Sequence, residues 1–301
     1  MRANEVADIL QRRGVEWFAE TEHDWITFPS PDDEAWLAAL DDLRGQGVEL
    51  RPVDGTIAVR SAGRLVVAIH PPDRGWLVAI IDDLGFRRDR AQQLIDLAVP
   101  IFMAVLPDRP HSVDIARMAG AAGLPVMLHQ PMEPRGYPDV NPGKRAMMSS
   151  QTEAEWRRLL DENLDALPGV MGLNNHMGSA LSRDERAARV LATTARRRDL
   201  LLVDSLTVPD SQIYRVCREL GGRCLRRDVF LDNERSDGAV SAQAEQWFEL
   251  ARKHGLAVAI GHPYAVTIGV LGNLLAEIER RQLRLIGAVR LNAWLKRNKT
   301  R

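Results

Sequence analysis

The chain has 301 residues, and its 40 lysine and arginine residues nearly balance its 41 aspartate and glutamate residues. This balance argues against a nucleic-acid-binding protein with a broadly basic surface, and a hydrophobic fraction of 45% argues against a disordered chain. Only two cysteines are present, Cys217 and Cys224, which excludes a disulfide-rich scaffold and a cysteine-rich zinc module. We expect both to be packing residues without a redox role.

The first seventy residues predict a small α+β unit. Helical patterns cover Ala3–Arg12 and a stretch from Ser30 to about Arg44, where Pro31 suits the first helical turn. The same region also contains four strand-like runs, at Trp25–Phe28, Val48–Pro52, Thr56–Val59 and Leu65–Ile69. Because Pro71–Gly75 interrupts this pattern, we expect two domains, 1–72 and 73–301.

After Gly75, short apolar runs alternate with amphipathic stretches. The runs are Leu77–Ile81, Ile101–Val105, Val126–Leu128, Val170–Leu173, Leu200–Val203, Val229–Leu231, Val258–Ile260 and Leu283–Ile286. Strands that are apolar on both faces are typical of a parallel sheet covered by helices. Seven or eight such units predict an α/β fold with a distorted (β/α) barrel, with an open doubly wound sheet as the alternative. Both architectures place the active site at the carboxyl ends of the strands.

The sequence contains no segment with the character of a signal peptide or a membrane span. The first residues are polar and acidic, and the longest apolar run, Trp76–Ile81, is far shorter than the ~20 residues of a membrane-spanning helix. We therefore expect no integral membrane segment. The expected location is the cytoplasm, or the periplasm or exterior if the sequence is a trimmed form.

Ionisable or polar side chains follow strand after strand of the larger domain. They are Asp82, Asp83, His129, Glu133, Asn174, Asn175, His176, Ser179, Asp204, Asp232 and His262. One polar strand end means little, but a series of them in a parallel α/β chain is typical of an active-site face. Neighbouring residues of a strand point to opposite faces. Because that alternation relaxes at a turn, we expect Asp82 and Asp83 to face the same cavity.

In their order, these strand ends resemble the divergent polysaccharide deacetylase family, a remote relative of the NodB-type carbohydrate esterases. The resemblance covers roughly residues 75 to 290. The motifs that carry it are Ile81-Asp-Asp-Leu-Gly85, Leu128-His-Gln-Pro-Met-Glu-Pro134, Asn174-Asn-His-Met-Gly-Ser179, Asp204-Ser205, Val229-Phe-Leu-Asp232 and Ile260-Gly-His-Pro263.

The resemblance implies a NodB-like distorted barrel and a divalent metal, usually zinc, bound by one aspartate and two histidines. Carried over, Asp83 and His129 become metal ligands and Asp82 the catalytic base. The classical second histidine after the third strand is replaced by Glu133, so His176 is the natural substitute ligand. The classical Arg-x-Pro-Tyr motif is absent, whereas the terminal general-acid histidine matches His262.

The chemistry of these residues agrees with the resemblance. One carboxylate and two imidazoles form a normal open zinc site, at which water becomes a nucleophile at neutral pH. The implied reaction is removal of an acetyl group from an N- or O-acetylated carbohydrate, with cell-wall polysaccharide as one candidate. The remaining strand-end residues are predicted to bind substrate or to orient a ligand: Glu133, Asn174, Asn175, Ser179, Asp204 and Asp232.

Three alternatives stay open. A different metal-dependent hydrolase, such as a phosphoesterase, would need cations at the strand ends, where Arg135, Lys144 and Arg227 are the near candidates. A non-catalytic glycan-binding or scaffolding protein would retain the barrel. A two-carboxylate glycosidase would have to pair Asp82 with Asp232. The near-zero net charge is compatible with a neutral carbohydrate, and the oligomeric state is left open.

Overall fold

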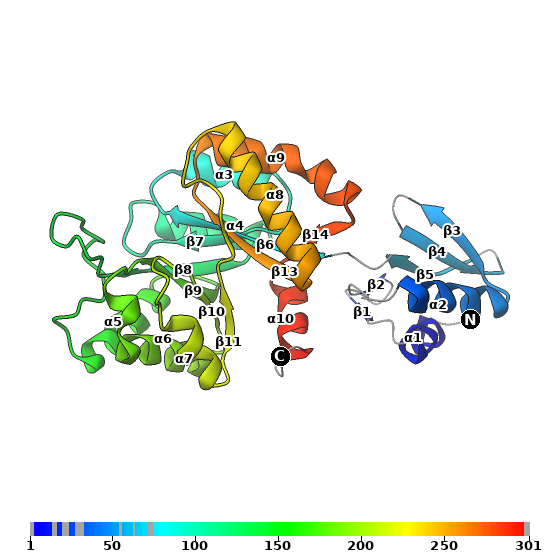
Figure 1. The fold of residues 1–301 in the computed structure, drawn as a ribbon, viewed down its shortest axis with the longest axis horizontal. Coiled ribbons are helices and arrows are strands. Elements are labelled where there is room, and N and C mark those ends of the chain that lie inside the picture. Colours follow the sequence, from blue (N-terminus) through cyan, green and yellow to red (C-terminus); the bar gives the residue numbers. More distant parts are fainter. Residues whose placement is uncertain are drawn as a thin grey trace. The chain divides into compact units, whose positions relative to one another are not determined.

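A computed structural model describes residues 3–13, 17–19, 24–27, 33–53, 56–62, 64–70 and 75–297 (Figure 1). The chain divides into two compact units. One consists of Met1–Trp76, Ala251–Gly255 and Ile278–Arg284, and the other contains the rest of the chain. The predicted boundary between residues 72 and 73 lies outside the described residues. In the described part of the chain, no helix combines the length and the apolar character that a bilayer span requires.

The smaller unit has the α+β composition expected from its sequence. Its elements are α1 (Ala3–Arg12), β1 (Trp17–Ala19), β2 (Asp24–Thr27), α2 (Asp33–Gly45), β3 (Glu49–Val53), β4 (Thr56–Ser61) and β5 (Arg64–His70). They form one sheet in the order β1-β2-β5-β4-β3, in which β2 and β5 are parallel and the other pairs are antiparallel. Strand β1 was not predicted.

The larger unit is a parallel sheet surrounded by helices. Its strands are β6 (Gly75–Leu84), β7 (Phe102–Val105), β8 (Val126–Met132), β9 (Val170–Met177), β10 (Leu201–Asp204), β11 (Arg223–Arg226), β12 (Val229–Phe230), β13 (Leu256–Gly261) and β14 (Leu283–Leu285). Its helices are α3 (Arg88–Asp96), α4 (Ser112–Ala121), α5 (Glu153–Asp165), η1 (Leu181–Arg183), α6 (Glu185–Arg197), α7 (Ile213–Glu219), α8 (Asp237–His254), α9 (Ala265–Arg280) and α10 (Ala288–Arg297).

The sheet of the larger unit is curled. This follows because a short segment of the chain connects the two strands at opposite ends of the sheet. The hydrogen-bonded order is β11-β10-β9-β8-β7-β6-β13-β12, with β14 also pairing with β6. Strands β11 and β12 stand at opposite ends of this order, yet only Arg227 and Asp228 separate them in sequence. Eight flat strands would span about 34 Å at ~4.8 Å spacing, whereas three Cα–Cα steps reach at most about 11 Å. The distorted barrel expected from the sequence is therefore confirmed, as a curled parallel half-barrel.

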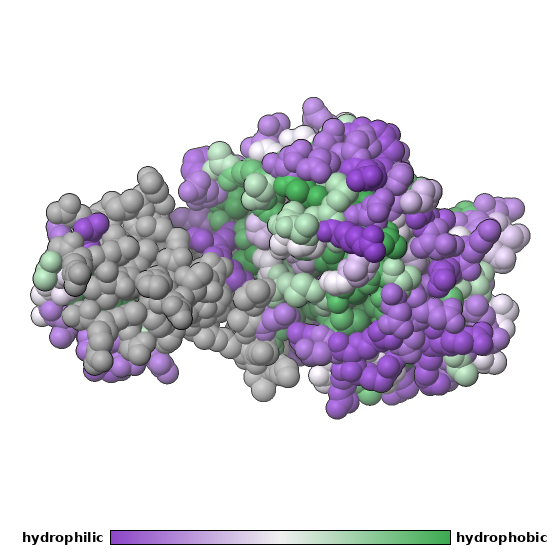
Figure 2. Space-filling model, turned by 180° about the vertical axis from the view of Figure 1, so that it is seen from behind, coloured by the Kyte–Doolittle hydropathy of each residue, from purple (hydrophilic) through white to green (hydrophobic). Residues whose placement is uncertain are grey.

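Apolar side chains fill both sides of this sheet. Strand β6 is buried from Gly75 to Asp82, and α5 and α8 contribute the fully buried Trp156 and Trp247 to the core. Figure 1 shows helices α5, α6 and α7 along one flank of the sheet and α3, α8 and α9 along another. In Figure 2, hydrophobic residues gather in the middle of one face of the unit, between hydrophilic margins. The polar strand ends thus follow strands whose bodies lie in a buried apolar core.

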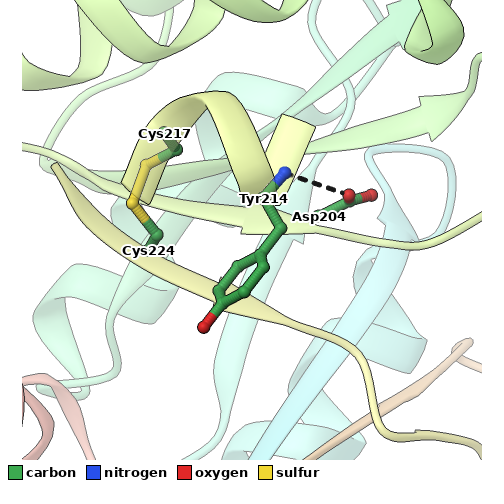
Figure 3. Close-up of a disulfide and its surroundings, with 4 residues drawn as sticks. All are labelled: Asp204, Tyr214, Cys217 and Cys224. Atoms are coloured by element: carbon green, nitrogen blue, oxygen red, sulfur yellow. Dashed lines mark hydrogen bonds between the residues drawn. A yellow bond between two sulfur atoms is a disulfide. The ribbon is translucent and has the colours of Figure 1, made fainter. Parts of the chain in front are cut away.

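The two cysteines are joined, which corrects the expectation of two separate packing residues. Cys217 in α7 and Cys224 in β11 form a disulfide (Figure 3). A tight turn at Gly221 and Gly222 folds β11 back along α7, and a Cβ atom on Gly222 would lie 2.8 Å from the Cys217 sulfur. The sequence spacing alone did not show this reversal of direction.

Candidate active site

Strand β6 ends with two carboxylates that reach the same place. The Asp82 Oδ2 atom lies 3.7 Å from His129 Nε2, and the Asp83 Oδ1 atom lies 3.2 Å from the same nitrogen. In a regular strand the two side chains would point to opposite faces. Here Asp83 has a φ of 56°, in the left-handed region, and the register with β7 shifts between Ile81 and Leu84. This local distortion brings both carboxylates close to the same His129 nitrogen.

The two histidines of the site come from neighbouring strands. The register of β8 and β9 pairs His129 with Asn174, and residues two apart on a strand share a face. His176 therefore projects on the same side as Asn174, diagonally across from His129. The two imidazole rings lie 4.9 Å apart between centroids. Strand pairing thus places a second imidazole beside His129, although the motif after β8 contains Glu133 in place of a second histidine.

Three potential ligand atoms converge at the end of the sheet. Asp83 Oδ1 lies 2.8 Å from His176 Nδ1 and 3.2 Å from His129 Nε2, and the two nitrogens are 3.2 Å apart. The three residues form a group whose ligand atoms all lie within 4.8 Å of one another. Asp83 Oδ1 is buried, yet no donor is oriented to hydrogen-bond to it. A proton on His176 can satisfy one neighbour at most, whereas a cation would satisfy all three atoms, so these residues fit a metal ion.

Asn174 fixes the orientation of both His129 and Asp82. Its Nδ2 group donates to Asp82 Oδ1 at 2.8 Å and to Ser205 Oγ at 3.1 Å, so its Oδ1 atom is the acceptor that faces His129 Nδ1 at 2.8 Å. His129 must then carry its proton on Nδ1. This tautomer leaves the Nε2 lone pair directed at Asp83 and His176, as a metal ligand requires.

The ionisation of these groups is consistent with metal binding. Burial acts to raise the pKa of Asp83, but the nearby His129 and His176 outweigh it and hold that pKa well below its usual range. Burial lowers the pKa of His176, which keeps its imidazole neutral. Burial also raises the pKa of Asp82. Burial acts to lower the pKa of His129, but the Asp82 and Asp83 carboxylates outweigh it and raise that pKa, so a bound cation would have to displace a proton from His129. The site thus combines an ionised Asp83 and a neutral His176 with a second carboxylate, Asp82, of increased basicity.

His262 lies on the other side of Asp83 and is held by Asp232. Asp232 Oδ1 accepts a hydrogen bond from His262 Nδ1 at 2.9 Å, and Oδ2 accepts from the His262 backbone N–H at 2.6 Å and from the Thr267 hydroxyl at 2.7 Å. The free Nε2 atom of His262 lies 3.7 Å from Asp83 Oδ2. Burial acts to lower the pKa of His262, but the Asp232 carboxylate outweighs it and raises that pKa.

Several residues predicted to contact substrate are enclosed by protein. Asn174, Asn175, Asp204 and Asp232 are each at most 3% exposed and hydrogen-bonded to neighbouring groups. Asn175 Oδ1 accepts the Ser205 N–H, and Asp204 accepts the N–H groups of Leu206 and Tyr214. With no free surface for a ligand, these four side chains are better placed to position the site than to bind substrate.

Glu133 and Ser179 lie apart from the converging ligand atoms. The Glu133 carboxylate accepts the Ser149 N–H, and the Ser179 hydroxyl accepts the Arg135 N–H at 3.0 Å. Both contacts secure the loop between β8 and α5. Within the described residues, the group of converging ligands contains Asp83, His129 and His176 but not Glu133.

Sequence reasoning missed Thr267 and two aromatic residues beside the site. Thr267 is fully buried in the first turn of α9, where a threonine carries no signal beyond ordinary helix capping. Phe86 and Tyr264 line a cleft that also contains Asp83 and His262. Both residues stand close in sequence to strand-end motifs. Aromatic residues in loops are so common, however, that this position alone did not indicate a site.

The chain is similar in sequence to one protein family and to two individual proteins. The sequence model of the divergent polysaccharide deacetylases matches residues 79–291. The uncharacterized protein YibQ of Escherichia coli (strain K12) is 30% identical over 214 residues, which cover 71% of this chain and 66% of that protein, just under two thirds. An uncharacterized protein of Haemophilus influenzae (strain ATCC 51907 / DSM 11121 / KW20 / Rd) is 31% identical over 195 residues, covering 65% and 69% of the two chains.

The fold also has a counterpart among solved structures. The crystal structure of an uncharacterized protein from Agrobacterium tumefaciens C58 superposes with a TM-score of 0.67 at 19% identity. The superposition covers 71% of this chain and 87% of that one. At this level of identity, the similarity concerns the fold alone.

Proposed function

The chain belongs to the divergent polysaccharide deacetylase family, and on this premise we propose that it is a metal-dependent hydrolase that removes an acetyl group from a carbohydrate. The observation that carries the proposal is the convergence of Asp83 Oδ1, His129 Nε2 and His176 Nδ1 on one point, with the carboxylate oxygen buried and lacking a hydrogen-bond donor. We infer that these atoms hold a divalent cation. Zinc is the ion we propose, because one carboxylate and two imidazoles are a donor set that it prefers.

Asp82 is the residue we assign as general base. When bound, the ion would supply a Lewis acid that polarises the acetyl carbonyl and lowers the pKa of water toward about 7. Asp82 lies beside the ligand set. Its Oδ1 atom is held by Asn174, which leaves Oδ2, 3.7 Å from His129 Nε2, as the oxygen that would accept a proton. Burial raises its pKa, which makes it a better proton acceptor than an exposed aspartate. It would take the proton from the attacking water.

His262 is the residue we assign as general acid. Its Nδ1–H is held by Asp232, so Nε2 faces the pocket and can carry the proton that the leaving group needs. In amide hydrolysis, oxygen from water bonds to the carbonyl carbon, the C–N bond breaks, and this proton goes to the departing amine. The products are acetate and a free amino sugar. An O-acetyl group would be released in the same way, with a hydroxyl as the leaving group.

The structure argues against the glycosidase alternative. A glycosidase needs two carboxylates that both face the scissile bond. The Asp232 side chain is fully buried, and both of its oxygens accept hydrogen bonds from His262 and Thr267. The contacts of Asp232 therefore favour a role in orienting His262.

The test measures metal content and acetate release in the same preparations. The protein, stripped with a chelator and reloaded with Zn²⁺, is assayed on N-acetylated hexosamine oligomers, on acetylated xylan and on a generic phosphoester. We expect acetate release only with metal. Asp82→Asn should keep the metal and lose at least about 100-fold in kcat. Asp96→Asn, an exposed carboxylate on α3, is the matched control and should behave as wild type.

The outcomes separate the remaining alternatives. Phosphoester cleavage without acetate release would indicate a different metal-dependent hydrolase. Binding of oligomers without turnover would indicate a non-catalytic glycan-binding protein. Failure of the protein to bind Zn²⁺, Co²⁺, Ni²⁺ or Mn²⁺ would refute the metal site itself.

We propose an oxidising compartment, periplasmic or secreted, as the place of action. The buried disulfide between Cys217 and Cys224 supports this, because such bonds persist mainly outside the reducing cytosol. The test is to isolate the protein from the cells that naturally produce it, denature it, and alkylate its thiols with and without prior reduction. Thiols that react without prior reduction would support the cytoplasmic alternative.

A further inference from the structure

A cleft of 340 Å³ borders the candidate metal centre. Asp83 and His262 are among its lining residues, and the remainder come from the end of β6, the turn after it, the first residues of α3, and the segment between β13 and the start of α9. An acetyl group that reaches Asp83 and His262 must carry the rest of its saccharide past this surface. The chemistry of the cleft therefore bears on which saccharide the protein accepts.

Aromatic side chains form part of the walls. Phe86 is 51% exposed, and the Tyr264 ring lies 5.5 Å from the His262 ring. Arg235 fixes the Tyr264 ring, because its guanidinium carbon lies 3.9 Å from the ring centroid and its Nη2 donates to the Tyr264 hydroxyl at 2.6 Å. Flat aromatic surfaces next to polar groups suit the C–H faces of sugar rings.

The charged side chains of the cleft are mostly cationic. Arg87 and Arg90 line it, and Asp83 is the carboxylate among the lining residues. Arg87 is paired with Asp89. Arg90 Nη1 donates to the neutral amide oxygen of Gln93 at 2.9 Å, and no carboxylate of the described residues lies within ion-pair distance of it.

Arg90 differs from the ion-paired arginines of this unit. Those arginines form ion pairs along their own helix or with a neighbouring one, as Arg189 does with Glu185 and Arg198 with Asp161. Arg90 is half-buried and lines a cleft whose carboxylate is a candidate metal ligand. With a cation bound beside Asp83, the cleft would carry excess positive charge. A guanidinium without a carboxylate partner is a ready site for a carboxylate or phosphate group of a ligand.

We propose that this cleft selects an acetylated saccharide bearing an anionic group, with Arg90 recognising the charge and Phe86 and Tyr264 contacting the sugar ring. The proposal rests on the proposed hydrolase function and specifies its substrate class. It revises the neutral carbohydrate inferred from the near-zero net charge, because net charge averages over the whole surface. The arginines beside the site determine the local potential.

The test compares three N-acetylated hexosamine oligomers of equal length, one neutral, one carboxylated and one phosphorylated. With the Zn²⁺-loaded protein, we expect kcat/KM for at least one charged oligomer to exceed that for the neutral one by about tenfold or more, mainly through KM. Arg90→Gln should abolish most of this ratio, and Arg90→Lys should restore part of it. Arg117→Gln, an exposed arginine on α4, is the control and should leave the ratio unchanged. Phe86→Ala should weaken all three oligomers alike.

Binding of the same oligomers to Asp82→Asn, measured by calorimetry, separates this inference from the proposed hydrolase. Equal acetate release from neutral and charged oligomers would overturn the inference and leave the hydrolase intact. Arg90-dependent binding of charged oligomers without acetate release from any of them would support the inference and refute the hydrolase. A preference that survives Arg90→Gln would overturn the role of Arg90. A preference for the carboxylated or the phosphorylated oligomer would support the inference and identify the anion.

Discussion

Two polar clusters at the strand ends of the larger unit differ in how their buried acceptor atoms are satisfied. In the candidate metal centre, formed by Asp83, His129 and His176, three ligand atoms converge and a buried carboxylate oxygen lacks a donor. In the neighbouring cluster, both oxygens of Asp204 accept backbone N–H groups, at 2.9 Å from Leu206 and 3.2 Å from Tyr214 (Figure 3). Both clusters contain buried polar atoms, although Asp83 and His176 are only partly buried as residues. The unpartnered Asp83 Oδ1 atom distinguishes the first cluster, and under the proposed function a cation would complete it.

The largest expected effect is the loss of metal binding in Asp83→Ala. Removal of one of three protein ligands should raise the Kd for Zn²⁺ at least about 1,000-fold, about 4 kcal/mol, measured by calorimetry or chelator competition. Without metal, the variant should be somewhat less stable than wild type at neutral pH, because His129 and His176 hold the Asp83 pKa well below its usual range and the fold therefore favours the ionised carboxylate. If Asp83→Ala binds Zn²⁺ with an affinity within threefold of wild type, Asp83 is not a metal ligand, and the contrast with the Asp204 cluster fails.

The next effect is on stability, in the Asp204 cluster. Asp204→Ala leaves two backbone N–H groups without their charged acceptor and should lower the free energy of unfolding by about 3 kcal/mol in urea titrations. Asp204→Asn keeps one acceptor oxygen and should lose about half as much. Zn²⁺ affinity should stay within about twofold of wild type in both variants. A large loss of affinity with little loss of stability would assign Asp204 to the metal centre.

Removal of the disulfide should act on the same structural cluster. Cys217 and Cys224 are seven residues apart, and opening so short a loop costs about 2.5 kcal/mol of folding free energy in the chain-entropy treatment. The double variant Cys217→Ser with Cys224→Ser should unfold at correspondingly lower urea and retain its Zn²⁺ affinity. Wild type treated with reductant is the matched comparison. A changed Zn²⁺ affinity in the double variant would instead show that the disulfide supports the candidate metal centre.

The smallest effect expected is that of the residue joining the two clusters. Asn174 contacts His129 and Asp82 on one side and Ser205 on the other. Asn174→Ala should weaken Zn²⁺ binding about 30-fold, or about 2 kcal/mol. Asn174→Asp keeps the acceptor for His129 but loses the donor to Asp82, so it should retain metal affinity and lose activity. Equal losses of affinity in both variants would contradict the assigned hydrogen-bond directions.

The sequence by itself determined the parallel α/β character of the larger unit and the polar side chains that stand at its strand ends. Apolar runs followed by Asp82–Asp83, His129 and His176 give each strand a buried body and a polar end, and this pattern is local. A parallel sheet brings those ends to one edge whatever its detailed shape. The small α+β unit could likewise be predicted from its strand and helix patterns, apart from the three-residue β1.

Only the tertiary structure decided which of these polar side chains converge on one point and which are enclosed by protein. Strands β6 and β9 are three places apart in the sheet, about 14 Å if it were flat, yet Asn174 Nδ2 lies 2.8 Å from Asp82 Oδ1. That contact depends on the curl of the sheet, which no local pattern encodes. The same holds for Asp232, whose predicted substrate contact is replaced by hydrogen bonds to His262 and Thr267, and for Cys217 and Cys224. In each case the partner lies on another element, and its direction is set by long-range packing.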